Sequence, residues 1–197
     1  IFNSLNSIQY YVLDQEEEPA LEFLTKFSAL MRAVLNNSEK LYIPITDEVA
    51  FLELYLELEK GRHIGKFEYE IEISSEITQR ELLIPPMLLQ PFIENTIFHG
   101  ISHLKGGGRI EIGFDLCKDS VCCTITDNGV GRQKASELKK LKKGNSYKSK
   151  STQIIHNRLA ILNEIDSPDY SSRTEDLYDS AGKAMGTKVI IQFPIIS

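Results

Sequence analysis

The chain has 197 residues, of which 42% are hydrophobic and 25% are charged, and its formal net charge is −6. This length suits one large domain, or one compact domain with a smaller helical piece, and the hydrophobic share is sufficient for a buried core. The negative charge argues against a general nucleic-acid-binding protein, which needs a basic surface to neutralise phosphates.

Residues 1–62 have the hydrophobic spacing of helices. Near the start, apolar residues recur at helical intervals, at Phe2, Leu5, Ile8 and Val12. A second helix is expected to include Pro19 in its first turn, where proline is tolerated. In a third helix Thr46 can act as the cap, with Asp47 and Glu48 favourably placed in the first turn. The third helix has two apolar stripes, so we expect it to pack against two partners.

From residue 63 the hydrophobic period changes. Apolar residues alternate with glutamates over residues 67–73, which predicts a strand with one buried face. The same alternation predicts further strands at 110–116, 121–127 and 187–193. Helical spacing predicts helices at 88–100, 132–143 and 152–165. The predicted fold class is therefore α+β, with a helical segment at 1–62 and, at 63–197, an α/β layer whose mixed sheet is covered by helices on one face.

The cysteine residues and the first residues of the chain indicate the cellular compartment that we expect. Cys117, Cys122 and Cys123 are odd in number and lack a C-x-x-C spacing, which favours a reduced environment over disulfides or zinc. No apolar run is long enough to span a bilayer, and no signal peptide is visible. Because the chain opens at Ile1 without a leader, we expect a cytoplasmic piece of a membrane-anchored bacterial protein whose membrane region lies upstream.

Asp127 is the first candidate for chemistry. Alternation places it at the end of strand 121–127, on the face that the apolar residues turn to the core. A carboxylate there needs donors or a ligand, because an unpaired buried charge is costly. Gly129 and Gly131 follow at once and permit a tight turn and a close approach of the backbone to a ligand. Taken alone, Asp-Asn-Gly is also the sequence of a hairpin turn.

Thr187 is the predicted partner of Asp127. It lies on the core-facing side of the last strand, directly after Gly186. If the two strands are antiparallel neighbours, the end of one lies beside the start of the other, and both side chains share one pocket floor. A carboxylate that accepts from an exocyclic amine, beside a small hydroxyl, suits the recognition of adenine.

The helix expected at 88–100 carries a second group of polar residues. Asn95 and His99 are four residues apart and share a face, and Gln90 and Glu94 share an adjoining face. The amide oxygen of Asn95 can ligate Mg²⁺, which prefers oxygen donors together with phosphates and waters. The carboxylate of Glu94 can orient or deprotonate an attacking group. Taken by itself, His99 is more readily interpreted as a buried structural histidine that pairs with a carbonyl.

Three segments together resemble a known superfamily. PFIENTIFHG (91–100) resembles the N-box, DNGVG (127–131) resembles the first glycine box, and Gly186 with Thr187 resembles the terminal G-T strand of GHKL ATPases. The N-box wording is similar to that of LytS/YehU-type sensor histidine kinases. IFNSLN (1–6) is similar to the stretch after the phospho-accepting histidine in the motif N-P-H-F-x-F-N-x-L-N, and FSALMR (27–32) and YLELEKGR (55–62) match the helical region of that family.

The resemblance implies a fold and an activity. Residues 1–62 would be a helical dimerisation and phosphotransfer segment, and residues 63–197 a catalytic ATP-binding domain with the GHKL (Bergerat-type) sandwich. The protein would be a histidine kinase that binds ATP with Mg²⁺, forms a homodimer and phosphorylates a response regulator. The acceptor histidine would lie just before Ile1, so the chain would not phosphorylate itself at that position.

The resemblance also implies roles for individual residues. Glu94 and His99 would be catalytic, and Asn95 would hold Mg²⁺. The nucleotide would be bound by Asn95 and by Asp127, Gly129, Gly131, Ser151, Thr152 and Thr187. Of these, Asp127 would accept from the adenine amine, with Thr187 assisting, and the two glycines would shape the loop around the nucleotide. Residues 132–152 would form a lid over the phosphates.

One departure from the family keeps other interpretations open. The family lid often ends in a glycine box, whereas SKSTQ (149–153) has no glycine and therefore has less conformational freedom for binding phosphate. A degenerate kinase that serves as a dimeric signalling scaffold is the alternative that this departure favours. A GHKL ATPase of another kind is the third hypothesis, although the helices before the ATP domain follow the kinase layout.

Overall fold

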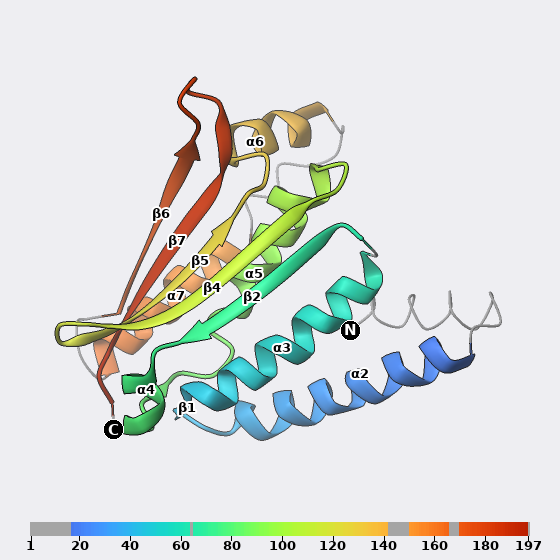
Figure 1. Ribbon diagram of the computed structural model, residues 1–197. Coiled ribbons are helices and arrows are strands. Elements are labelled where there is room, and N and C mark those ends of the chain that lie inside the picture. Colours follow the sequence, from blue (N-terminus) through green and yellow to red (C-terminus); the bar gives the residue numbers. More distant parts are fainter. Residues whose placement is uncertain (1–16, 64, 142–149, 166–169, 197) are drawn as a thin grey trace.

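The computed structural model describes residues 17–63, 65–141, 150–165 and 170–196, with the backbone alone at 139–141, 150–156 and 165. The helix predicted near Phe2 lies outside these residues. Two long helices, α2 (Glu17–Ser38) and α3 (Ile45–Arg62), form an antiparallel pair (Figure 1). Pro19 lies in the first turn of α2 as predicted. The expected cap at Thr46 is wrong, because the N-cap of α3 is Pro44, two residues earlier, and it makes no side-chain cap hydrogen bond.

Five strands form a mixed sheet in the order β2-β4-β5-β7-β6. Strand β2 is parallel to β4, and the other neighbouring strands are antiparallel. The strands are β2 (Phe67–Ile73), β4 (Gly108–Cys117), β5 (Ser120–Asp127), β6 (Ser171–Tyr178) and β7 (Ala184–Pro194). The mixed sheet and four of its strands were predicted, but β6 was not, because this edge strand carries mostly polar residues and lacks a buried alternation.

The helix predicted at 88–100 is divided into two shorter elements, and a third element follows it. They are α5 (Gln90–Asn95), a π-helical turn η1 (Thr96–Gly100) and a 3₁₀ turn η2 (Ile101–His103). The segment expected to form a lid begins with α6 (Arg132–Leu141), and α7 (Lys150–Ile165) comes later in the chain. Three small elements also occur, namely β1 (Ile43–Pro44), α4 (Ser75–Arg80) and β3 (Leu83–Ile84), and β1 pairs with β3.

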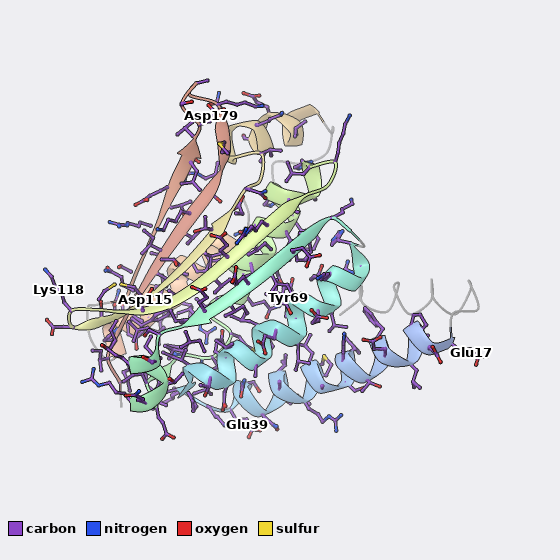
Figure 2. All side chains as sticks on the ribbon, viewed as in Figure 1. Glu17, Glu39, Tyr69, Asp115, Lys118 and Asp179 are labelled. Atoms are coloured by element: carbon purple, nitrogen blue, oxygen red, sulfur yellow. The ribbon has the colours of Figure 1, made fainter. Side chains whose placement is uncertain are left out.

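The helices cover one face of the sheet, as predicted. The strands turn their apolar residues to the helices, where Ile110, Ile125 and Ile191 are fully buried, whereas the glutamates of β2 are exposed on the other face. Figure 1 shows α5 and α7 behind the sheet, and α3 alongside β2. In Figure 2 Tyr69 lies between β2 and α3, and its hydroxyl donates to the Glu57 carboxylate at 2.8 Å.

One hydrophobic core joins the helical pair to the sheet. Leu52 and Leu56 of α3 are fully buried in the same cluster as residues of β4, β5 and β7. The boundary expected after residue 62 therefore stays a prediction, because α3 packs as part of the sheet's cover. Cys117, Cys122 and Cys123 are free thiols, and the pKa of Cys123 is raised by its burial. Among the described helices, none has the length and apolarity needed to cross a bilayer.

Candidate functional site

Asp127 lies where the alternation predicts. It ends β5, is only 3% exposed, and pairs directly with Thr187 across the antiparallel β5–β7 ladder. The Thr187 hydroxyl donates a short hydrogen bond to Oδ2, and the Gly129 backbone N–H donates to Oδ1 at 2.7 Å. Burial raises the pKa of Asp127, while these donors and the Thr96 hydroxyl act in the opposite direction. The carboxylate is thus desolvated, held in place by donors, and faces a cavity.

Two glycines are needed because the backbone crowds this carboxylate. A Cβ on Gly129 would lie 2.6 Å from both the Asp127 Oδ1 atom and the Gly100 Cα atom. Gly186 has φ +131°, and a Cβ there would overlap the Asp127 carbonyl oxygen. Both positions therefore exclude any side chain: Gly129 allows the loop after β5 to lie against η1, and Gly186 allows β7 to lie against the end of β5. Gly131 has φ +77°, a conformation that favours glycine.

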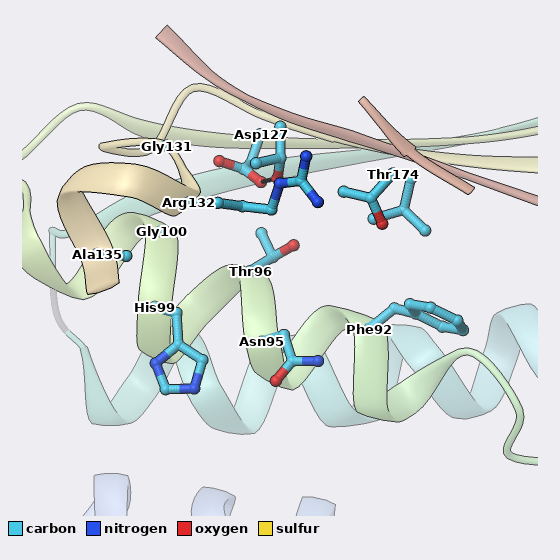
Figure 3. Close-up of a pocket in the computed structure, with 12 residues that line it drawn as sticks. Phe92, Asn95, Thr96, His99, Gly100, Asp127, Gly131, Arg132, Ala135 and Thr174 are labelled. Atoms are coloured by element: carbon cyan, nitrogen blue, oxygen red, sulfur yellow. Dashed lines mark hydrogen bonds between the residues drawn. The ribbon is translucent and has the colours of Figure 1, made fainter. Parts of the chain in front are cut away.

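The helix opposite supplies the other wall of a cavity of about 260 Å³. Figure 3 shows Thr96 directed towards Asp127, whereas the side chains of Asn95 and His99, which also line the cavity, project from the helix away from Asp127. Both polar and apolar residues line the cavity: Phe92, Asn95, Thr96, His99, Gly100, Asp127, Gly131, Arg132, Ala135, Thr174, Thr187 and Val189. The structure thus brings together Asn95, His99, Asp127, Gly131 and Thr187 from the predicted set.

Glu94 does not line this cavity. Its Oε1 atom accepts a hydrogen bond from the Gln90 amide at 2.9 Å. It also helps to raise the pKa of Tyr55, after desolvation and Glu59. Since Tyr55 and Glu59 belong to α3, the Glu94 carboxylate faces the helical pair. A catalytic role for Glu94 stays a prediction, and its position favours contact with groups presented by the helices.

The other predicted contacts are spread around the cavity. Gly129 is not a lining residue, although it holds Asp127 through its N–H. Ser151 and Thr152 lie in the first turn of α7, and their side chains fall outside the described part of the chain. The middle of the expected lid, residues 142–149, is likewise outside the described residues. The nucleotide-binding roles of these residues stay predictions.

Arg132 and Thr96 are lining residues that the sequence interpretation missed. The Arg132 guanidinium makes two hydrogen bonds to the Asp176 carboxylate of β6, at 2.8 and 2.6 Å, and so ties the start of α6 to the sheet edge. Its partner could not be found from sequence, since β6 itself was not predicted. Thr96 had a usable signal, because it directly follows Asn95 in the N-box.

The arrangement suits a flat ligand that carries an amine. Phe92 and Val189 provide apolar walls, and Asp127 provides an acceptor at the floor. The volume is below the roughly 300–1,000 Å³ of complete small-molecule sites, so it matches a base better than a whole nucleotide. Within the described residues, no cluster of three His, Cys, Asp or Glu side chains is suited to hold a metal. A Mg²⁺ ion at Asn95 would therefore need phosphate and water oxygens as further ligands, which is its usual habit.

Sequence relatives agree with the family expected from the motifs. The histidine kinase family model matches residues 1–67. The sensor histidine kinase/phosphatase LytS of Staphylococcus aureus is 35% identical over 136 residues, or 68% of this chain. The chain is a member of the LytS-type sensor histidine kinases. It covers only 22% of the length of LytS, so the full activity of such kinases is not shown by the match.

Solved structures agree with the fold. The histidine kinase domain of the blue-light activated histidine kinase from Erythrobacter litoralis superposes with a TM-score of 0.53 at 13% identity, covering 87% of this chain and 74% of that one. The mycobacterial sensor histidine kinase MprB gives 0.50 at 15% identity, covering 78% and 96%. At these identities the likeness shows the fold alone. The GHKL architecture of the sensor kinase is thereby confirmed.

Proposed function

We propose that this sensor kinase segment binds Mg-ATP in the Asp127 cavity and transfers the γ-phosphoryl group to a histidine upstream of Ile1. The observation that supports it most strongly is the buried Asp127 carboxylate at the floor of an apolar cavity. The histidine kinase family match and the LytS relative provide independent support for the kinase chemistry.

Adenine fits the groups on the cavity floor. The Gly129 N–H and the Thr187 hydroxyl donate to Asp127, and the Thr187 backbone and the Thr96 hydroxyl also stabilise its ionised form, so a ligand N–H would share the carboxylate oxygens with these donors. The adenine amine provides that donor, and it compensates part of the carboxylate's desolvation. Phe92 and Val189 contact the faces of the base in this arrangement. A ligand without a donor at this position would add no hydrogen bond to those that the protein already makes to the carboxylate.

The phosphates extend from the base towards Asn95 and His99. The Asn95 amide oxygen would hold Mg²⁺, which would supply positive charge to neutralise the phosphates. His99 lies on the same wall, where its ring can donate to a phosphate oxygen. Ser151 and Thr152, in the first turn of α7, would donate to phosphates from the lid side. Backbone N–H groups at such a helix start favour anions.

Glu94 acts on the acceptor rather than on the nucleotide in this proposal. Its carboxylate faces α3, the side on which the helical segment lies. A carboxylate there can accept a proton from, or orient, the incoming imidazole. The partners that follow are a second copy of the chain, joined through the helices, and a response regulator that receives the phosphoryl group. The piece would lie in the cytoplasm, attached to the membrane through a region upstream of Ile1, and it would bind no nucleic acid.

Calorimetric titration with Mg-ATP and with ADP tests the nucleotide site. The wild-type chain is expected to bind both, and Asp127→Asn to weaken binding by at least about tenfold, because its amide donors oppose the adenine amine. Asp115→Asn, an exposed aspartate on β4, is the matched control and should leave affinity unchanged. A wild type without affinity at millimolar nucleotide would contradict the proposal and favour the scaffold alternative.

Phosphotransfer is tested on a chain extended upstream to include the acceptor histidine. With labelled ATP we expect an acid-labile phosphoprotein, and Asn95→Ala should abolish the label by removing the metal ligand. Steady ATP hydrolysis without any labelled protein would overturn the kinase assignment and favour another type of GHKL ATPase.

A further inference from the structure

The turn that leads into the cavity helix has an unusual backbone. Met87 has φ +54°, a left-handed conformation that is strained for a residue with a side chain. It follows two prolines and precedes α5, the six-residue helix whose last residue is Asn95. Such strain persists only when the surroundings fix the backbone from several sides.

Two charged side chains from distant elements fix this turn. The Glu48 carboxylate of α3 is 0% exposed and accepts a hydrogen bond from the Met87 N–H at 2.8 Å. The Leu89 backbone N–H also helps to stabilise the ionised form of Glu48. From the other side, the Arg158 guanidinium of α7 donates to the Met87 carbonyl at 3.3 Å and to the Pro86 carbonyl at 2.6 Å.

The side chains of Glu48 and Arg158 therefore bind the N–H and the carbonyl of the same residue. Met87 has its N–H bound from α3 and its carbonyl bound from α7. Leu89 is the N-cap residue of α5 and makes no side-chain cap, and its backbone N–H is one of the groups that interact with the Glu48 carboxyl group. Phe92 and Asn95 of the cavity wall lie within the next two turns. The position of the turn therefore determines where Phe92 and Asn95 lie.

We propose that Glu48 and Arg158 are a positioning pair that clamps the 86–89 turn and so sets the Phe92–Asn95 wall of the nucleotide cavity. Because one member lies on the helical pair and the other on the helix after the lid, a displacement of either element is carried to the cavity wall. The importance of the pair for nucleotide binding rests on the proposed function. The effect of the pair on the backbone of the turn does not depend on the proposed function.

Hydrogen exchange of the 197-residue chain, measured without nucleotide, tests the clamp directly. Glu48→Met and Arg158→Met, which remove the hydrogen-bonding groups, should speed exchange of the amides at 92–100 by about tenfold or more. Exchange in β5 should change by less than about twofold, since local opening is separate from global unfolding. Glu48→Gln and Arg158→Lys keep an acceptor and a donor, and should restore most of the protection.

Matched controls use the same substitutions at exposed sites. Glu53→Met on α3 and Arg80→Met on α4 should leave exchange at 92–100 unchanged. Equal acceleration in β5 and α5 would show a merely general loss of stability and would overturn the proposal. So would a Gln or Lys variant no better protected than its Met counterpart. If Glu48→Met fails to fold, the two Arg158 variants and Glu48→Asp, whose shorter arm withdraws the carboxylate, give the same comparison.

ADP affinity separates the clamp from the proposed function. The two Met variants should lose about tenfold in affinity for ADP, and the conservative variants should recover it. A wild type that binds no ADP would contradict the proposed function and leave the exchange result standing. A wild type that binds ADP, with Met variants of equal affinity, would instead contradict the positioning role.

Discussion

Two buried carboxylates in this chain have opposite surroundings. Asp127 and Glu48 are both withdrawn from water, and burial raises the pKa of both. Glu48 is enclosed by protein and accepts from the backbone of a turn, whereas Asp127 has donors on one side and a cavity on the other. The comparison shows that burial alone does not identify a ligand site. The free space in front of the oxygen atoms distinguishes the two.

The largest expected effect on stability comes from adding a side chain at Gly186, beside the Asp127 backbone. Gly186→Ala should destabilise the fold by about 4 kcal/mol, because the new Cβ overlaps the Asp127 carbonyl and the φ of +131° is strained for alanine. Gly182→Ala is the control, since it has φ +76° but open space around it, and should cost about 1 kcal/mol. Chemical denaturation measures both. Equal losses would show that crowding at Asp127 is unimportant.

The next largest effect concerns how the free energy of unfolding depends on pH through Glu48. Burial raises its pKa to about 7 from 4.5, despite the opposing influence of Arg158. Between these pH values the native state binds more protons than the unfolded state, so stability falls as pH rises. Glu48→Gln removes this dependence. Its stability relative to wild type should therefore increase from pH 4.5 to 7, by up to about 3 kcal/mol, in denaturation measured at several pH values.

Asp127→Asn should have a smaller effect on stability of the nucleotide-free chain. The raised pKa of Asp127 again means that the charged form is disfavoured in the fold, so the neutral amide should gain stability relative to wild type as pH rises. We expect a gain of less than about 1 kcal/mol at neutral pH, since the Thr187 hydroxyl can still pair with the amide. A loss of several kcal/mol in a thermal melt would place Asp127 with Glu48 as a structural acid.

The smallest effect concerns the exposed pair at the cavity mouth. The Arg132 side chain is 55% exposed and that of Asp176 is 26% exposed. Asp176→Asn should therefore change the free energy of unfolding by less than about 1 kcal/mol, because solvent screens such pairs. Thermal melts in low and high salt measure it. A larger loss that persists in high salt would show that β6 depends on this contact.

Sequence patterns predicted the floor of the site better than its wall. Period-two alternation was sufficient to place Asp127 and Thr187 on one face and at adjoining strand ends, and the structure has them paired. That success has a physical reason, since strand parity is local and the side-chain period is two. The motif spacing also brought Asn95 and His99 to the cavity correctly.

The clamp and the wall depend on contacts that no local pattern contains. Glu48 was expected as a helix-start acid, and it does lie in the first turn of α3, but its burial comes from a turn 39 residues later. Arg158 joins Met87 across 71 residues. The π-helical turn at 96–100 also escaped prediction, because its residues have ordinary helical spacing. Hydrogen bonds between side chains and a backbone far away in the sequence decide the clamp.

The bond between Thr187 and Asp127 joins residues 60 positions apart. During synthesis the N-box and the glycine loop therefore leave the ribosome well before the strand that completes the floor beneath them. A chain ended by a stop codon anywhere before β7 would contain nearly every recognisable motif and still leave its central acid without its strand partner. For this architecture, the formation of β7 (Ala184–Pro194) decides whether the floor of the binding site is complete.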